Sequence, residues 1–151
     1  MIEIWQVGNT GVRNPMRIQD AFRLYAESNL VEKIRGVAGA IAFTNYLCER
    51  GILNNAPGKD PTGSYGRKWR LVFNRNGFTY DVAKDGMSQA DIGPVDGITP
   101  FGRAFLIADT VPAVQECFLR ASAMHMEQMS DGGWFSPLRW TLAVKIGRAH
   151  V

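Results

Sequence analysis

The 151-residue chain is poor in the residues that build disulfide-rich or metal-rich proteins, with only two cysteines and two histidines. The cysteines are too few for a disulfide framework and lack the close spacing of zinc ligands. No apolar run approaches the roughly 20 residues that a membrane span needs, and no signal-peptide pattern opens the chain. We therefore expect a cytoplasmic protein with no membrane partner and no metal site within these residues.

The common catalytic motifs are also missing. The chain contains no P-loop, no dinucleotide-binding fingerprint and no nucleophile elbow. Carboxylate-lysine nucleases place an acidic residue two positions before a lysine, so that one binds the divalent ion and the other stabilises charge at the scissile phosphate. None of the lysines here has an acidic residue at that position. We expect no catalytic residue in this stretch.

Apolar and aromatic residues, by contrast, are plentiful. Hydrophobic residues make up 46% of the chain and aromatic residues 11%, and mean hydropathy is −0.13. This composition excludes wholesale disorder and supplies a core for one domain.

Two helices are predicted early in the chain. Asn14 and Pro15 are typical of a helix start, an N-cap followed by proline at the first helical position. Apolar residues at helical spacing predict helices over 15–28 and 37–50, and Gly51 ends the second. The apolar faces are expected to carry Ile18, Ala21, Phe22 and Tyr25 in the first helix, and Val37, Ile41, Thr44, Leu47 and Cys48 in the second.

A third helix is predicted over 64–76, with Ser64 as its N-cap and Gly77 as its stop. The side of this helix that should face solvent is almost purely cationic. The residues expected to face the core are Tyr65, Trp69, Val72 and Phe73, whereas Arg67, Arg70 and Asn74 share another face, flanked by Lys68 and Arg75.

A β-hairpin is predicted after this helix, with a strand over 78–82, a long loop over 83–95 and a return strand over 96–98. Three helices followed by a hairpin is the order of a winged helix, which places its third helix in the DNA major groove. The predicted fold is mainly α with a small β-hairpin, winged-helix-like. Three later helices are expected: one starting at Pro100, one over 111–129 with His125 in the core, and one starting at Pro137.

Charge is distributed unevenly along the chain. Residues 1–76 hold 11 Lys and Arg against 6 Asp and Glu, a net of +5, whereas residues 77–151 hold 6 against 8, a net of −2. The cationic third helix is open to two interpretations: a solvated surface, or a DNA-binding surface whose arginines contact bases and whose lysines contact phosphates. The position of this helix before a hairpin favours the DNA-binding interpretation. The candidate contacts are Arg67, Arg70 and Asn74 for the major groove, Lys68, Arg75, Arg13 and Arg17 for phosphates, and Lys84 for the wing.

Four short segments, in order along the chain, carry a family pattern. They are Trp5 with residues 8–15 (Gly-Asn-Thr-Gly-Val-Arg-Asn-Pro), residues 67–70 (Arg-Lys-Trp-Arg) with 76–78 (Asn-Gly-Phe), residues 98–104 (Ile-Thr-Pro-Phe-Gly-Arg-Ala) and residues 135–139 (Phe-Ser-Pro-Leu-Arg). Together they resemble the AlwI family of type II restriction endonucleases. The resemblance implies a type IIS enzyme, which binds a short asymmetric site in double-stranded DNA and hydrolyses phosphodiester bonds a few base pairs away.

The resemblance also implies an amino-terminal recognition part and a separate, later cleavage domain that uses Mg²⁺. A companion DNA methyltransferase is then expected to be encoded nearby. On this interpretation residues 1–130 form the recognition domain and residues 131–144 begin a truncated helical subdomain. Residues 145–151 are expected to be a non-native tail, because 146–151 resemble a translated sequencing adapter. The alternatives are a winged-helix transcriptional regulator without catalytic activity, and a helical protein-interaction domain with a solvated basic face.

Overall fold

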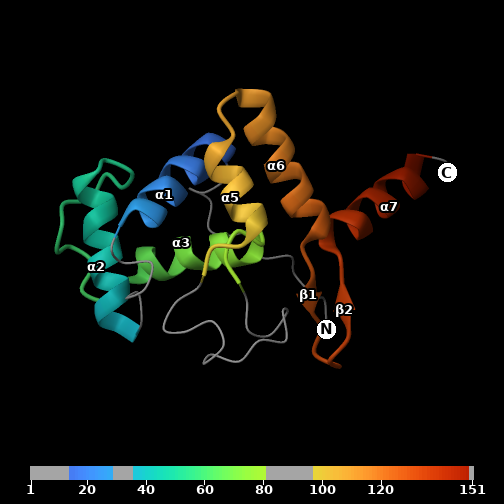
Figure 1. Cartoon of the computed structure of the whole chain (residues 1–151). Coiled ribbons are helices and arrows are strands. Elements are labelled where there is room, and N and C mark those ends of the chain that lie inside the picture. Colours follow the sequence, from blue (N-terminus) through green and yellow to red (C-terminus); the bar gives the residue numbers. More distant parts are fainter. Residues whose placement is uncertain (1–13, 29–35, 81–96, 150–151) are drawn as a thin grey trace.

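The computed structural model describes residues 14–28, 36–80 and 97–149. In these ranges the chain is mainly helical, as predicted, with one pair of two-residue strands (Figure 1). None of the helices in these ranges is long and apolar enough to cross a lipid bilayer. The helices are α1 (Pro15–Glu27), α2 (Gly36–Glu49), α3 (Ser64–Arg75), α5 (Pro100–Ile107), α6 (Val111–Met124) and α7 (Pro137–Ala149).

The predicted helix start at Asn14 is confirmed, and the helix predicted from Pro100 begins there, with Thr99 as its N-cap. The Asn14 side chain accepts a hydrogen bond from the backbone N–H of Met16, and the Thr99 hydroxyl accepts one from Gly102 at 2.9 Å. In both cases proline follows at the first helical position, where its missing N–H costs nothing. The third start differs from the prediction, because Gly63 is the N-cap and Ser64 instead donates its hydroxyl to Asp60.

A cluster of aromatic rings forms the core. Phe78 and Phe105 stack with centroids 4.1 Å apart and planes 6° apart, and Phe22 contacts both. Burying each such side chain stabilises the fold by roughly 1.5–3 kcal/mol, so the cluster dominates the packing of the helices. The buried rings are Phe22, Tyr25, Phe43, Trp69, Phe73, Phe78 and Phe105.

Two polar side chains of α1 hold the end of α5. The buried amide of Gln19 donates to the carbonyl oxygens of Phe105 and Ala108 at 2.8 and 2.7 Å. The guanidinium of Arg23 donates to the carbonyls of Leu106 and Ala108. These bonds satisfy carbonyls that the helix end leaves without a partner.

Helices α2 and α3 approach each other closely at Gly66. A Cβ atom added there would lie 2.3 Å from the carbonyl oxygen of Ala40, which no side chain tolerates. The short distance lets the Gly66 N–H donate to the hydroxyl of Thr44 at 2.9 Å. Glycine at this position therefore sets the spacing at which α3 packs on α2.

The predicted wing hairpin is represented by one antiparallel bridge, between Thr79 and Ile98. The Tyr80 N–H donates to the carbonyl of Gly97 at 3.0 Å, next to this bridge. The rest of the predicted hairpin lies outside the described residues. The mainly α class thus stands, and the winged-helix arrangement stays a proposal.

The fifth predicted helix, over 111–129, is wrong at its end. Helix α6 stops at Met124, and the backbone of His125 turns to an extended conformation. Strand β1 (Glu127–Gln128) then pairs antiparallel with β2 (Trp134–Phe135). This pairing takes up the backbone that would have continued the helix. The expected domain boundary at 130/131 falls in the turn between the two strands.

Burial also departs from the prediction at two aromatic or branched side chains. Tyr65, expected in the buried stripe of α3, is 37% exposed, and Val37, expected on the apolar face of α2, is 55% exposed. Val37 and Tyr65 are each the second residue of their helix, and Tyr65 lies about 100° around the helix from Gly66, the residue that packs on α2. The rest of the α3 stripe is buried as predicted: Trp69, Val72 and Phe73.

Candidate nucleic-acid interface

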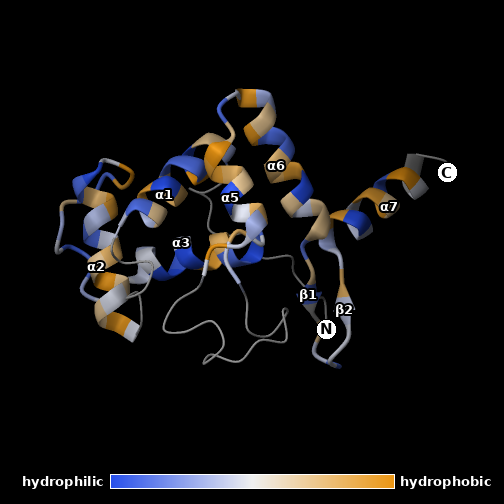
Figure 2. Cartoon of the chain, viewed as in Figure 1, coloured by the Kyte–Doolittle hydropathy of each residue, from blue (hydrophilic) through white to orange (hydrophobic). Residues whose placement is uncertain are grey.

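Helix α3 lies below α1 and α5 in Figure 1, and hydrophilic residues make up much of its length (Figure 2). Arg67 and Lys68 are exposed, and Leu71 lies one turn after Arg67. Arg70 and Asn74 are half-buried. Of the predicted α3 contacts, Arg67 and Lys68 thus present their charge most openly to solvent.

Local contacts orient these two exposed cations. The guanidinium of Arg67 donates to the carbonyl oxygen of Thr62, in the loop before α3. The ammonium of Lys68 lies 5.5 Å from the centroid of the Tyr65 ring, a cation–π distance. Both contacts are exposed, so a phosphate or a base edge can replace them at low cost.

The carboxylate of Asp60 organises the start of α3. It accepts hydrogen bonds from the Tyr65 N–H at 3.0 Å, from the Ser64 hydroxyl and from the N–H and hydroxyl of Thr62. Desolvation raises the pKa of Asp60, but these hydrogen bonds outweigh it and lower the pKa from 3.8 to about 2. The negative charge also stabilises the positive end of the helix dipole.

Asn74 and Arg75, at the other end of α3, are engaged within the protein. The Asn74 amide oxygen accepts a hydrogen bond from the hydroxyl of Thr79. The Arg75 guanidinium lies 3.6 Å from the carboxylate of Glu127, and its side chain is 21% exposed. Contact of Arg75 or of the Asn74 amide oxygen with DNA therefore requires sharing or exchanging an existing partner.

Arg17 is turned toward the protein. Its guanidinium donates to the carbonyl oxygen of Ile52 at 2.6 Å and lies 6.0 Å from the centroid of the Trp69 ring. It ties α1 to the loop after α2 and to α3. Two other predicted contacts, Arg13 and Lys84, lie outside the described residues.

His125 is a satisfied core histidine, as predicted, with 7% of its surface exposed. Its Nδ1 lies 2.5 Å from the carbonyl oxygen of Arg75, and its Nε2 lies 2.8 Å from Oε1 of Glu127. The side chain therefore joins the end of α3 to the segment after α6.

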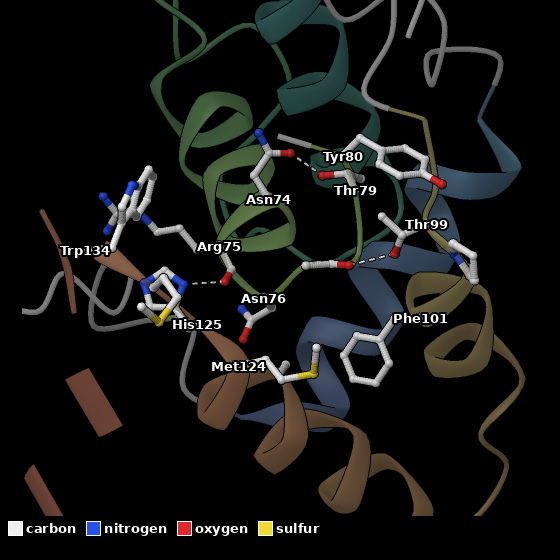
Figure 3. A pocket seen from close by; sticks show the side chains of 14 residues that line it. Asn74, Arg75, Asn76, Thr79, Tyr80, Thr99, Phe101, Met124, His125 and Trp134 are labelled. Atoms are coloured by element: carbon white, nitrogen blue, oxygen red, sulfur yellow. Dashed lines mark hydrogen bonds between the residues drawn. The ribbon is translucent and has the colours of Figure 1, made fainter. Parts of the chain in front are cut away.

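A pocket of about 680 Å³ lies beside this junction (Figure 3). Its walls come from the end of α3, the residues after it, the start of α5, the end of α6 and β2. No sequence pattern predicts this pocket, because its aromatic side chains are far apart along the chain and share no spacing. They are Tyr80, Phe101 and Trp134.

Within residues 14–28, 36–80 and 97–149, no three His, Cys, Asp or Glu side chains form a group that could hold a metal ion. No family model, no curated protein and no solved structure matches the chain. The family resemblance rests on the sequence motifs alone.

Proposed function

We propose that this chain is the DNA-recognition part of a type IIS restriction endonuclease and that α3 contacts double-stranded DNA. The observation that carries the proposal is the pair of exposed cations, Arg67 and Lys68, on a helix held rigidly to α2 at Gly66. A fixed helix with cations on its open face suits insertion into the major groove.

The contacts divide between bases and phosphates. We assign Arg67 to a base edge, where a guanidinium binds guanine through two hydrogen bonds, and Lys68 to a phosphate. Arg70 and Asn74 extend the same surface toward the end of the helix. Two other predicted phosphate contacts, Arg17 and Arg75, already contact groups within the protein. We therefore assign phosphate contact to Lys68 before either of them.

The family resemblance carries the second part of the proposal, which is that the full enzyme cleaves DNA. The full enzyme hydrolyses phosphodiester bonds near a short asymmetric site, with Mg²⁺ in a later domain. We place it in the cytoplasm, beside a companion DNA methyltransferase. No step of the hydrolysis is assigned to the residues described, which supply recognition only.

Duplex binding by the purified chain tests the proposal. We expect the affinity for a mixed-sequence duplex to fall steeply between 50 and 200 mM salt, because bound cations release counterions from the phosphates. Arg67→Ala with Lys68→Ala should weaken binding about tenfold or more and flatten the salt dependence. Arg120→Ala is the matched control, because this arginine is exposed on α6, away from the proposed surface. If Arg67→Ala with Lys68→Ala leaves duplex binding unchanged, a protein-interaction domain becomes the better interpretation.

A winged-helix transcriptional regulator shares every feature of α3 described above and is the alternative. Reading the uninterrupted gene through codon 145 separates the two. A frame that continues into an acidic-x-Lys centre supports the nuclease, whereas a stop near that codon without a partner gene supports the regulator.

A further inference from the structure

The pocket at the end of α3 has three aromatic side chains in its wall, each from a different part of the chain. Tyr80 follows the Thr79 bridge, Phe101 lies in the first turn of α5, and Trp134 lies in β2 (Figure 3). Its volume of about 680 Å³ is in the range of small-molecule sites. Aromatic walls of this kind suit a flat, aromatic ligand.

Asn74 and Asn76 also line this pocket. Asn76 donates through Nδ2 to the carbonyl of Val72 at 2.8 Å, so its Oδ1 keeps its capacity to accept. Asn74 accepts through Oδ1 from Thr79, so its Nδ2 keeps its capacity to donate. In the described part of the chain neither atom has a hydrogen-bond partner. One donor and one acceptor beside aromatic walls suit a heterocycle with mixed polar edges.

We propose that this pocket binds a nucleobase, supplied by a nucleotide that leaves the helix of the bound DNA. Proteins that extrude a base hold it between aromatic or apolar side chains and bind its polar edge. Asn74 and Arg75, the last two residues of the proposed DNA-binding helix, line the pocket, so the pocket lies next to the end of that helix. The assignment of the base to DNA rests on the proposed function, but the affinity of the pocket for a base does not.

The first experiment titrates the full ¹⁵N-labelled chain with each deoxynucleoside 5′-monophosphate up to about 10 mM, since an isolated base should bind weakly. We expect the indole N–H of Trp134 and the side-chain amide of Asn76 to shift. The indole of Trp140, exposed on α7, is the internal control. An absence of shifts, or equal shifts with 2-deoxyribose 5-phosphate, which has no base, would overturn the proposal.

A matched pair of variants locates the binding. Trp134→Ala removes one aromatic wall and should weaken nucleotide binding about tenfold, whereas Trp140→Ala should leave it unchanged. Both side chains are at least 40% exposed, so neither replacement disturbs the core. Equal nucleotide affinity in the two variants contradicts the assignment to this pocket.

The second experiment identifies the source of the base. A set of duplexes, each with one mismatch, should include a position where the mismatch tightens binding about tenfold, because a mismatched base leaves the helix at lower cost. Trp134→Ala should lose this gain. Nucleotide binding without any mismatch gain would overturn the DNA source. A complete lack of duplex binding would overturn the proposed function as well, while the titration result for the pocket would stand.

Discussion

The backbone N–H of Gly66 donates to the hydroxyl of Thr44 at 2.9 Å, and this bond crosses the closest approach of α3 to α2. The same hydroxyl donates to the carbonyl of Ala40 at 2.8 Å. An N–H in the first turn of a helix has no partner within that helix. The threonine thus satisfies a buried donor and fixes the position of the proposed recognition helix.

We expect Gly66→Ala to destabilise the protein by about 1–3 kcal/mol or more, because the new methyl group collides with the backbone of α2. Thr44→Val should cost about 1–3 kcal/mol, since it leaves the Gly66 N–H buried without a partner. Denaturant unfolding measures both. Gly147→Ala is the matched control, because an added Cβ there meets no atom within 4 Å. Equal losses in Gly66→Ala and Gly147→Ala would contradict the close packing.

The carboxylate of Asp60 gives the stability a defined pH dependence. Its pKa is about 2 in the folded protein and 3.8 ordinarily, so the folded state favours the charged form. The resulting stabilisation is fully present above about pH 4 and is lost as pH falls through 2. Asp60→Asn, which keeps an acceptor but removes the charge, should cost about 0.5–1 kcal/mol at pH 6.

Unfolding curves between pH 6 and pH 2 measure this effect. The difference between the wild-type protein and Asp60→Asn should shrink toward zero at the acid end. Asp20→Asn, which removes an exposed carboxylate inside α1, is the control. A difference that stays constant with pH would show that the charge of Asp60 does not stabilise α3.

Arg17 and Arg67 should respond differently to replacement by alanine. Arg17→Ala removes the hydrogen bond to Ile52 and the contact with Trp69, so we expect a stability loss of about 1–2 kcal/mol. Arg67→Ala should change stability by less than about 0.5 kcal/mol, since its side chain is exposed, but should weaken duplex binding. Thermal unfolding together with a binding titration separates the two effects. The assignment of Arg17 to structure fails if its replacement lowers affinity and leaves stability intact.

His125→Ala should destabilise the protein by about 2 kcal/mol, because the change removes hydrogen bonds to the Arg75 carbonyl and to Glu127 from a buried site. Urea unfolding measures the loss. Gln115→Ala, an exposed change in α6, the helix that ends just before His125, should have little effect. Identical unfolding midpoints for the two variants would contradict the role of His125 as a link between α3 and α6.

Most of the helices could be predicted from sequence, because their signals are local. An asparagine or threonine before a proline marks a start, and apolar residues at helical spacing mark a buried face. The end of α6 could not be predicted in this way. The helical pattern continues through His125, but the helix ends where β1 begins to pair with β2 and where His125 contacts the carbonyl oxygen of Arg75, fifty residues earlier in the chain.

The candidate site likewise contains features that local sequence patterns predict and features that they do not. Helical geometry correctly predicts that Trp69 is buried while Arg67 and Lys68 are exposed to solvent. It does not anticipate that Arg17 bonds to Ile52 or that Arg75 lies beside Glu127, since long cationic side chains choose partners only once the fold has formed. The pocket has no local signal at all.

The bonds from Gln19 and Arg23 to the end of α5 have a consequence for the order in which the protein opens. A helix of eight residues is too short to be stable alone, and the carbonyls at its end depend on side chains of α1. When α1 detaches, α5 loses both its capping groups and the contact of Phe105 with the Phe22 ring. The amide protons of α1 and α5 should therefore exchange with solvent as one cooperative unit, although some eighty residues separate the two helices in the chain.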